Sequence, residues 1–189
     1  METDILAPPE EKHLWTYAEM LEKLPETNQP TELWNGELIV SAAPYCNHQK
    51  IVLNIARRMI DHVEREKLGE VYVSPIDVIL TERRVVQPDV VFVSKANAGI
   101  VQDRIRGVPD LTVEVISEGS WRRDRIDKKE LYAQFGVEEY WIVDPEARTM
   151  EIFVLTGDGF KLHAKGSEDE PVKSKLLPGL SMALRDVEL

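Results

Sequence analysis

The sequence predicts an α/β fold in which helices flank a mixed central β-sheet. The first observation is a long amphipathic helix, because Ile51, Ile55 and Met59 recur every four residues. Asn47 is placed to cap this helix and Gly69 to end it. The second observation is a set of short, β-branched apolar runs bounded by turn residues, which is typical of buried strands. These predicted strands span residues 71–80, 85–93, 111–117, 140–143 and 150–155, and residues 160–165 with a C-terminal tail finish the chain. Helices and strands in this order predict a layered sandwich.

The N-terminal part of the chain predicts a short helix and a hairpin. Thr16 and Glu19 match a capping box, which predicts a helix over residues 17–24. Asn35-Gly36 separates two strand-like runs, and Asn-Gly is a strong signal for a tight β-hairpin, here over residues 31–40. The fold class is therefore an α/β sandwich with an N-terminal β-hairpin.

Length and composition predict a single domain. The chain has 189 residues, of which 43% are hydrophobic, enough for one substantial core. Residues 1–12 are expected to form a flexible leader and residues 13–189 the domain. No apolar stretch approaches the roughly 20 residues of a membrane span, and the acidic N-terminus does not resemble a signal peptide. The single cysteine, Cys46, excludes an internal disulfide and predicts a cytoplasmic protein.

Two acidic residues stand on neighbouring predicted strands. Asp89 opens the run Val90–Val93, and Glu114 interrupts the run Leu111–Ile116. Burying an unpaired carboxylate costs several kcal/mol, so two such residues on adjacent strands need a shared partner, and a divalent metal ion is one. The simpler alternative is that each carboxylate meets water or an arginine at the end of its strand.

A lysine follows these strands on the next predicted helix, over residues 124–135, which Gly136 ends in a left-handed cap. Lys128 lies on the same helical stripe as the apolar residues Leu131 and Phe135, whereas Lys129 should face solvent. An inward lysine here can reach over the end of the Glu114 strand. The alternative is a lysine whose ammonium extends to water along the protein surface.

Asp89, Glu114 and Lys128 together predict metal-dependent hydrolysis of phosphodiesters. Carboxylate oxygens are hard ligands suited to Mg²⁺ or Mn²⁺. Such a metal polarises the scissile phosphate and lowers the pKa of bound water. The lysine would orient or deprotonate that water, or neutralise charge that develops on phosphorus. The polar stretch Ser94–Pro109 between strands is expected to be a mobile loop near this site.

Net charge is the main objection to a nucleic-acid substrate. The formal charge is −11 and the pI about 4.9, whereas duplex-binding proteins usually carry basic patches. Arginines nevertheless cluster beside the proposed site, and Arg122, Arg123 and Arg125 are candidates for contacts with phosphate. The charge lowers the expectation of a DNA substrate without excluding it.

An ordered set of short segments resembles one nuclease family. The segments are Asn35-Gly36-Glu37-Leu38, Pro44 to Gln49, Gln87-Pro88-Asp89-Val90, Pro109 to Ser117, Asp124 with Lys128 and Tyr132, and Gly136 to Pro145. Each is weak alone, but their order along the chain is specific. The chain resembles the Uma-type restriction endonuclease family, within the PD-(D/E)xK nuclease superfamily.

The resemblance implies a restriction-endonuclease-like fold and a Mg²⁺- or Mn²⁺-dependent DNA endonuclease, with the acids of the motif at Asp89 and Glu114. The lysine of the superfamily usually lies two residues after the glutamate, where this chain has Ile116. The chain is similar to members whose lysine has moved to the following helix, which again points to Lys128. A departure follows Glu114, because Ser117-Glu118-Gly119-Ser120 replaces the usual Pro-Ser-Thr turn.

Two further residues are site candidates. Glu37 matches an acidic position of the family and is expected to be an additional metal ligand, or else an acid at the solvated edge of the hairpin. His48, at the start of the long helix, is expected to contact phosphate or to hold a site carboxylate, or else to be a surface or capping group. A homodimer is expected, because one site cuts one strand.

Two other functions remain open at this point. One is a catalytically silent, nuclease-like module that binds nucleic acid or a protein, which the acidic balance and the altered Ser117–Ser120 turn favour. The other is a metal-dependent hydrolase of small phosphate esters. The intact set Asp89, Glu114 and Lys128 favours the DNA endonuclease.

Overall fold

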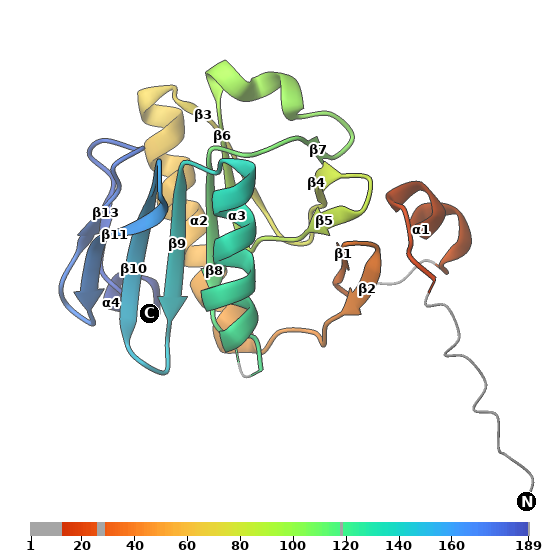
Figure 1. Cartoon of the computed structure of the whole chain (residues 1–189). Helices are drawn as coiled ribbons and strands as arrows, with labels where there is room; N and C mark the ends of the chain where they lie inside the picture. The colour runs from red at the N-terminus through yellow and green to blue at the C-terminus, as the bar shows by residue number, and fades with distance from the viewer. Residues whose placement is uncertain (1–12, 26–28, 118, 189) are drawn as a thin grey trace, which may run out of the picture.

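The computed structural model describes residues 13–25, 29–117 and 119–188, so the leader predicted over 1–12 lies outside the described residues. The larger sheet contains β3 (Gly69–Val73), β6 (Val90–Ser94), β8 (Leu111–Val115), β9 (Glu139–Asp144), β10 (Thr149–Thr156) and β11 (Gly159–Ser167). Its strand order is β11-β10-β9-β8-β6-β3 (Figure 1). β8 and β9 are parallel and the other neighbours antiparallel, which confirms the predicted mixed sheet.

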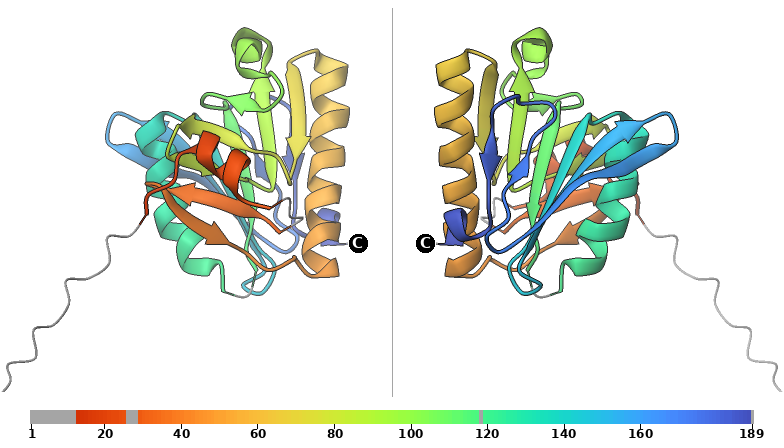
Figure 2. Two further views of the ribbon diagram at one scale, coloured as in Figure 1. Left: turned by 90° about the vertical axis from the view of Figure 1, so that its right-hand side faces the viewer. Right: turned by 90° about the vertical axis from the view of Figure 1, so that its left-hand side faces the viewer.

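Helices cover both faces of this sheet (Figures 1 and 2). The 21-residue helix α2 (Cys46–Glu66) packs on one face against Val113 and Val115 of β8. On the other face lie the π-helix η2 (Arg123–Lys128) and the helix α3 (Lys129–Phe135), with Leu131 and Tyr132 in the core. Since side chains alternate along a strand, Glu114 points to the face that η2 and α3 cover.

A second, smaller sheet lies on the side of α3 and carries the predicted hairpin. It contains β1 (Thr31–Trp34), β2 (Glu37–Val40), β4 (Val78–Thr81), β5 (Arg84–Val86) and β7 (Ile105–Arg106), in the order β2-β1-β5-β4-β7. Asn35 and Gly36 have φ angles of 53° and 87°, as a two-residue hairpin turn requires. The helix α1 (Tyr17–Lys23) packs on this sheet, and its capping box of Thr16 and Glu19 is present as predicted.

Two strands predicted as continuous are each divided between the sheets. The predicted strand 71–80 becomes β3 and β4, with Pro75 between them, and the predicted strand 85–93 becomes β5 and β6, with Pro88 between them. Proline lacks the N–H that a central ladder needs, so each chain segment leaves one sheet and enters the other there. The continuous predictions were therefore wrong at the prolines.

The predicted boundaries of the long helix and the predicted loop also differ from the structure. Tyr45, not Asn47, is the N-cap of α2, and Lys67 ends the helix at a φ angle of 56°. Gly69 instead begins β3, where a Cβ atom would lie 2.1 Å from the carbonyl oxygen of Val93. The segment 94–109 forms the 3₁₀-helix η1 (Lys95–Ile100) and β7 at the end of β6 away from Asp89, so the prediction of a loop near the site was wrong.

The C-terminal segment completes the core on the α2 face. It contains β12 (Val172–Lys173), β13 (Ser181–Met182) and the short helix α4 (Arg185–Glu188). Glu139 of β9 anchors this segment although its side chain is only 1% exposed. It accepts hydrogen bonds from Trp141 Nε1, Ser174 Oγ and the backbone N–H groups of Lys175 and Leu176, at 2.6–2.9 Å. No helix in these described ranges is long and apolar enough to cross a membrane.

Replacing Glu139 with alanine is expected to lower the free energy of unfolding by about 3 kcal/mol or more, because several buried donors lose one charged acceptor. Urea denaturation followed by tryptophan fluorescence measures this change. Glu138→Ala is the matched control, since the neighbouring Glu138 side chain is exposed. Equal stability of the two variants would contradict the anchoring role.

Candidate active site

Asp89 and Glu114 lie opposite each other at one end of the larger sheet. β6 and β8 are antiparallel with Val90 paired to Val113, so one further step along the ladder sets Asp89 beside Glu114. The backbone N–H of Val115 donates to Asp89 Oδ2 at 2.7 Å, which fixes that carboxylate at the strand end. Glu114 is 3% exposed. The structure thus brings together the two acids selected from the sequence.

Lys128 places its ammonium among these acids. Its Nζ lies 2.9 Å from Glu114 Oε1, 3.3 Å from Glu32 Oε1 and 3.8 Å from Asp124 Oδ1. The residue is 5% exposed, which argues against an ammonium that extends to water. Lys129 is half-exposed, with its ammonium 3.6 Å from the centre of the Phe153 ring. Lys128 therefore faces inward as the helical periodicity predicted, whereas Lys129, which was predicted to face solvent, partly covers the Phe153 ring.

Glu32 is a site residue that the sequence analysis missed. It lies on β1 and, besides contacting Lys128, accepts hydrogen bonds from the Gln87 backbone N–H at 2.9 Å and from Trp34 Nε1 at 3.1 Å. Glu37, the expected extra ligand, lies on the edge strand β2 opposite Trp34. The hairpin residue that contacts Lys128 is Glu32. Its signal in the sequence was an acidic residue inside the strand-like run Thr31–Trp34.

Asp124 and Tyr132 complete the surroundings of the lysine. Asp124 stands four residues before Lys128, is 3% exposed, and has its backbone carbonyl bound by the Tyr140 hydroxyl at 2.8 Å. Tyr132 is fully buried, and it donates its hydroxyl to Glu114 Oε1 at 2.8 Å. Tyr132 therefore orients the same carboxylate oxygen that Lys128 contacts.

His48 contacts Asp89 from the first turn of α2. Its Nε2 lies 2.9 Å from the carbonyl oxygen of Val115 and 3.3 Å from Asp89 Oδ2, so the proton on Nε2 is shared between them. Its Nδ1 is buried and has no hydrogen-bond partner among the described residues. Burial alone would lower the pKa of His48, but the Asp89 carboxylate and the Val115 carbonyl outweigh it and raise this pKa. Of the two roles expected for His48, holding a site carboxylate has this geometric support.

The carboxylates of the cluster outnumber its cations, and the pKa values reflect this. Burial raises the pKa of Glu114 well above its usual value, Lys128 opposes that rise, and Asp124, Asp89 and Glu32 add to it. Burial also raises the pKa of Asp124. Four carboxyl groups thus share one lysine and one histidine, which leaves a surplus of negative charge in a poorly solvated place.

Lys128 and Glu32 are the members whose charged forms the surroundings favour. Burial alone would lower the pKa of Lys128, but Glu114, Glu32 and Asp124 together raise it above its usual value. Burial would raise the pKa of Glu32, but Lys128 and the N–H donors of Gln87 and Trp34 lower it. The ammonium therefore keeps its proton at neutral pH.

The donors at this site fit a hard divalent cation. Asp89 and Glu114 offer carboxylate oxygens, and the surplus negative charge around Glu114 is what a cation would relieve. The part of the chain that the structure describes contains no group of three His, Cys, Asp or Glu side chains able to ligate one metal ion. A metal held by two carboxylates would keep several waters, as Mg²⁺ usually does.

The three candidate arginines differ in the residues that their side chains contact. Arg125 forms ion pairs with Glu151 and, at 3.2 Å, with Asp144, so its guanidinium neutralises two largely buried acids. Arg123 donates to Ser41 Oγ at 3.2 Å, and Arg122 is exposed. Their expected contacts with substrate remain a prediction, and Arg122 has the most accessible side chain of the three.

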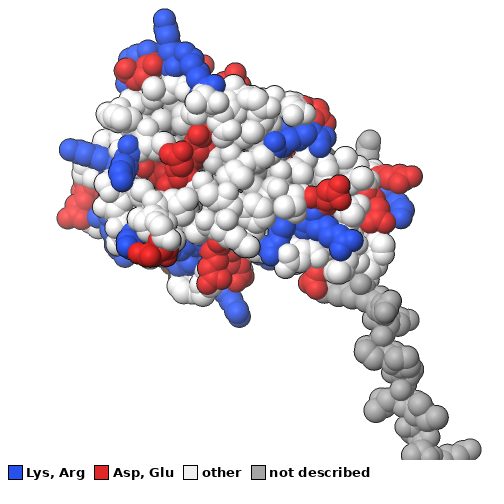
Figure 3. All heavy atoms as spheres, turned by 45° about the horizontal axis from the view of Figure 1, so that its top comes forward, with Lys and Arg blue, Asp and Glu red and all other residues white. Residues whose placement is uncertain are grey.

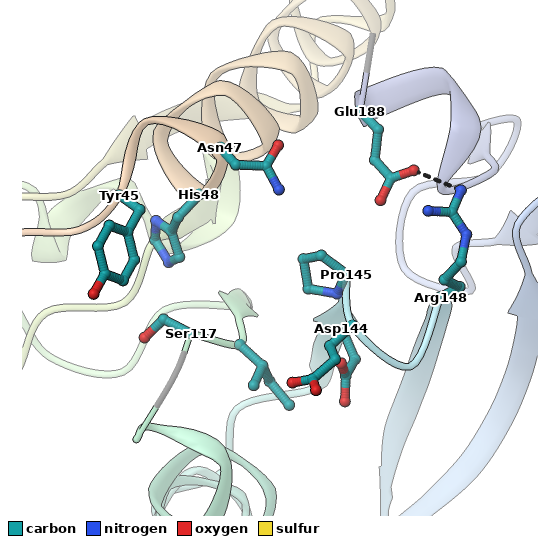
Figure 4. Close-up of a pocket in the computed structure, with 10 residues that line it drawn as sticks. Tyr45, Asn47, His48, Ser117, Asp144, Pro145, Arg148 and Glu188 are labelled. Carbon is teal, nitrogen blue, oxygen red and sulfur yellow. Dashed lines mark hydrogen bonds and ion pairs between the residues drawn. The ribbon is translucent and has the colours of Figure 1, made fainter.

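A cavity of about 370 Å³ lies next to the acids (Figure 4). His48 lines this cavity and also contacts Asp89. Tyr45 and Asn47, from the start of α2, line one side. Ser117, just after β8, and Pro145, just after β9, line the other. Cavities of this size are typical of sites for small organic groups.

Comparisons with known proteins agree with this architecture. A family model described as "Putative restriction endonuclease" (Uma2) matches residues 18–185. The chain belongs to this family. A crystal structure described as a putative nuclease of DUF820, from Anabaena variabilis, superposes with a TM-score of 0.76 at 17% identity, covering 92% of this chain and 97% of that one. No curated protein matches the chain.

The family match confirms the resemblance that the ordered segments indicated, and the superposition confirms the predicted nuclease-like α/β fold. At 17% identity the solved structure supports the fold alone. Nuclease function in the general sense, meaning hydrolysis of phosphodiester bonds in nucleic acid, follows from the family description.

Proposed function

We propose that this member of the restriction endonuclease family is a Mg²⁺- or Mn²⁺-dependent DNA endonuclease, in which Asp89 and Glu114 hold the metal and Lys128 supplies a fixed positive charge. The observation that carries the proposal is the buried contact of 2.9 Å between Lys128 Nζ and Glu114 Oε1, beside Asp89 on the next strand. When bound, the metal would polarise the phosphate and lower the pKa of a water molecule.

The residues of the chain have separable tasks in this proposal. Lys128 remains protonated, so it suits stabilisation of negative charge on the phosphate better than proton abstraction. Tyr132 holds Glu114, and His48 and the Val115 N–H hold Asp89, which keeps both carboxylates in fixed orientations. Glu32 replaces Glu37 as the candidate for a third acid, because it contacts Lys128.

A plasmid assay tests the proposal. Supercoiled DNA incubated with Mg²⁺ or Mn²⁺ is expected to be nicked or linearised, and EDTA is expected to stop the reaction. Asp89→Asn is expected to reduce the rate by about 10²-fold or more, because one metal ligand is weakened. Asp158→Asn, which alters an exposed turn carboxylate, is the matched control and should cut like wild type.

Cutting by Asp89→Asn at the wild-type rate would refute the role of Asp89. If the protein cleaved only small phosphate esters, these esters and not DNA would be its substrates. The expected homodimer is tested separately by light scattering at the protein concentration of the assay. A dimer with two active sites is expected to cut both strands together and so to form linear DNA without a nicked intermediate.

A catalytically silent binding module is the second candidate, and one observation favours it. Lys128 lies within 4 Å of three carboxylates, so the cluster already contains an internal cation. Calorimetric titration with Mn²⁺ separates the two functions. Binding by wild type and its loss in Asp89→Asn would support the nuclease, whereas no binding by wild type would support the silent module.

A further inference from the structure

The entrance of the cavity beside the acids carries an exposed aromatic ring. Tyr45 lines this cavity, and its residue is 69% exposed. It stands three positions before His48, about one helical turn away, and His48 in turn reaches Asp89 at 3.3 Å. An aromatic ring exposed to this degree makes little contribution to the core and is available for stacking.

The walls of the cavity suit a nucleobase and reject a phosphate. Glu146 and Glu188 contribute carboxylates, which would repel the sugar–phosphate backbone. Arg148 of the lining is already ion-paired with Glu188 at 3.0 Å and with Glu168. A carboxylate can instead accept hydrogen bonds from the N–H groups on the edge of a base. The Asn47 amide, which offers both donors and acceptors, points into the cavity opposite Pro145 (Figure 4). Polar groups of both kinds therefore face a space with apolar sides.

A second exposed aromatic ring follows the Glu114 strand along the chain. Trp121 is 54% exposed and lies 5.8 Å from the guanidinium carbon of Arg125. Tyr45 stands three positions before His48, and Trp121 stands three positions before Asp124, so each of the two exposed aromatic rings lies close in sequence to a residue of the candidate site.

The distribution of charge disfavours binding of a duplex through its phosphates. Duplex binding draws its affinity from lysines and arginines that neutralise phosphates, whereas this chain has a net charge of −11. Figure 3 shows acidic and basic side chains interspersed on the face in view, with uncharged areas between them. Single strands, by contrast, gain affinity from stacking of bases on aromatic rings.

We propose that the cavity lined by Tyr45 and Asn47 receives an unpaired nucleobase next to the scissile phosphate, so that the preferred substrate is single-stranded DNA or an unpaired segment within a duplex. This inference rests on the proposed nuclease function. Tyr45 stacks on the base, Asn47 bonds its edge, and the sugar–phosphate backbone remains outside, toward Asp89 and Glu114.

Binding measured without cleavage tests this inference independently of the nuclease activity. A fluorescein-labelled DNA oligonucleotide of 20 nucleotides and its duplex form are titrated with the protein in EDTA, and anisotropy gives both dissociation constants. The single strand is expected to bind at least about tenfold more tightly. Tyr45→Ala is expected to weaken single-strand binding by about fivefold to 100-fold, and Tyr45→Trp to preserve it, because stacking on one ring contributes this much.

Leu162→Ala is the matched control, since Leu162 is 53% exposed on β11, at the opposite edge of the larger sheet. Equal or tighter binding of the duplex, no binding of either DNA, or wild-type affinity of Tyr45→Ala would each overturn the inference. The plasmid assay decides the nuclease proposal by itself. Cleavage of duplex DNA without any dependence on Tyr45 would retain the nuclease and reject the base-binding cavity.

Discussion

Replacing Lys128 with methionine is expected to lower the free energy of unfolding by about 3–5 kcal/mol in EDTA, because a buried ion pair loses one partner. Glu32, Glu114 and Asp124 would then face one another without the ammonium that lies 2.9–3.8 Å from them. Methionine keeps most of the lysine's length, so the loss of stability reflects the removed charge more than a change in side-chain volume. Urea denaturation, monitored by circular dichroism, measures it.

The neighbouring lysine provides a control. Lys129→Met removes an ammonium that lies over the Phe153 ring and contacts no acid of the cluster among the described pairs, so a loss below about 1 kcal/mol is expected. Mn²⁺ is expected to restore part of the stability of Lys128→Met, since a bound cation neutralises the same carboxylates. Equal stability of the two variants in EDTA would contradict an ionised carboxylate cluster.

Glu114→Gln is expected to abolish metal-dependent cleavage while raising stability at neutral pH. Glutamine preserves the shape and an acceptor for the Tyr132 hydroxyl, but it is a poor metal ligand, so the rate is expected to fall by about 10²-fold or more. Burial raises the pKa of Glu114 in the folded protein, with the neighbouring acids adding to this effect, so ionisation of Glu114 opposes folding.

The pH dependence of this difference follows from the direction of the shift. Below the unfolded pKa of about 4.5, the carboxyl is neutral in both states, and wild type and Glu114→Gln should differ little. As pH rises through the raised folded pKa, wild type loses stability that the variant keeps, by at least about 1 kcal/mol. Denaturation at about pH 3.5 and pH 7.5 measures this change, with exposed Glu138→Gln as control. A variant less stable than wild type at pH 7.5 would show that ionised Glu114 stabilises the fold.

The part of the site that is local in sequence was predictable. Asp89 and Glu114 interrupt apolar runs, and alternation along the strands places both on one face. Lys128 follows from the helical period of its own segment. These inferences hold because each depends on the geometry of a single element and its neighbour along the chain.

Glu32 could not be predicted in this way, because its position depends on which strands pair. β1 pairs with β5 over more than fifty residues of chain, and this pairing makes β1 an inner strand and leaves Glu37 on the edge. The division of two predicted strands has a similar origin. The chain passes from one sheet to the other near Pro75 and near Pro88, and hydrophobic periodicity does not reveal which sheet a strand joins. The contact of the Tyr132 hydroxyl with Glu114 could not be predicted either, because a buried tyrosine has the same sequence pattern whether or not its hydroxyl contacts the site.

Lys128 also links the smaller sheet to the larger one. Glu32 belongs to the smaller sheet and Glu114 to the larger one, and a single ammonium contacts both. A movement of the hairpin away from the larger sheet would therefore separate Glu32 from Lys128 and leave the ammonium with Glu114 and Asp124 alone. The charge balance of the acidic cluster thus depends on how the two sheets pack against each other.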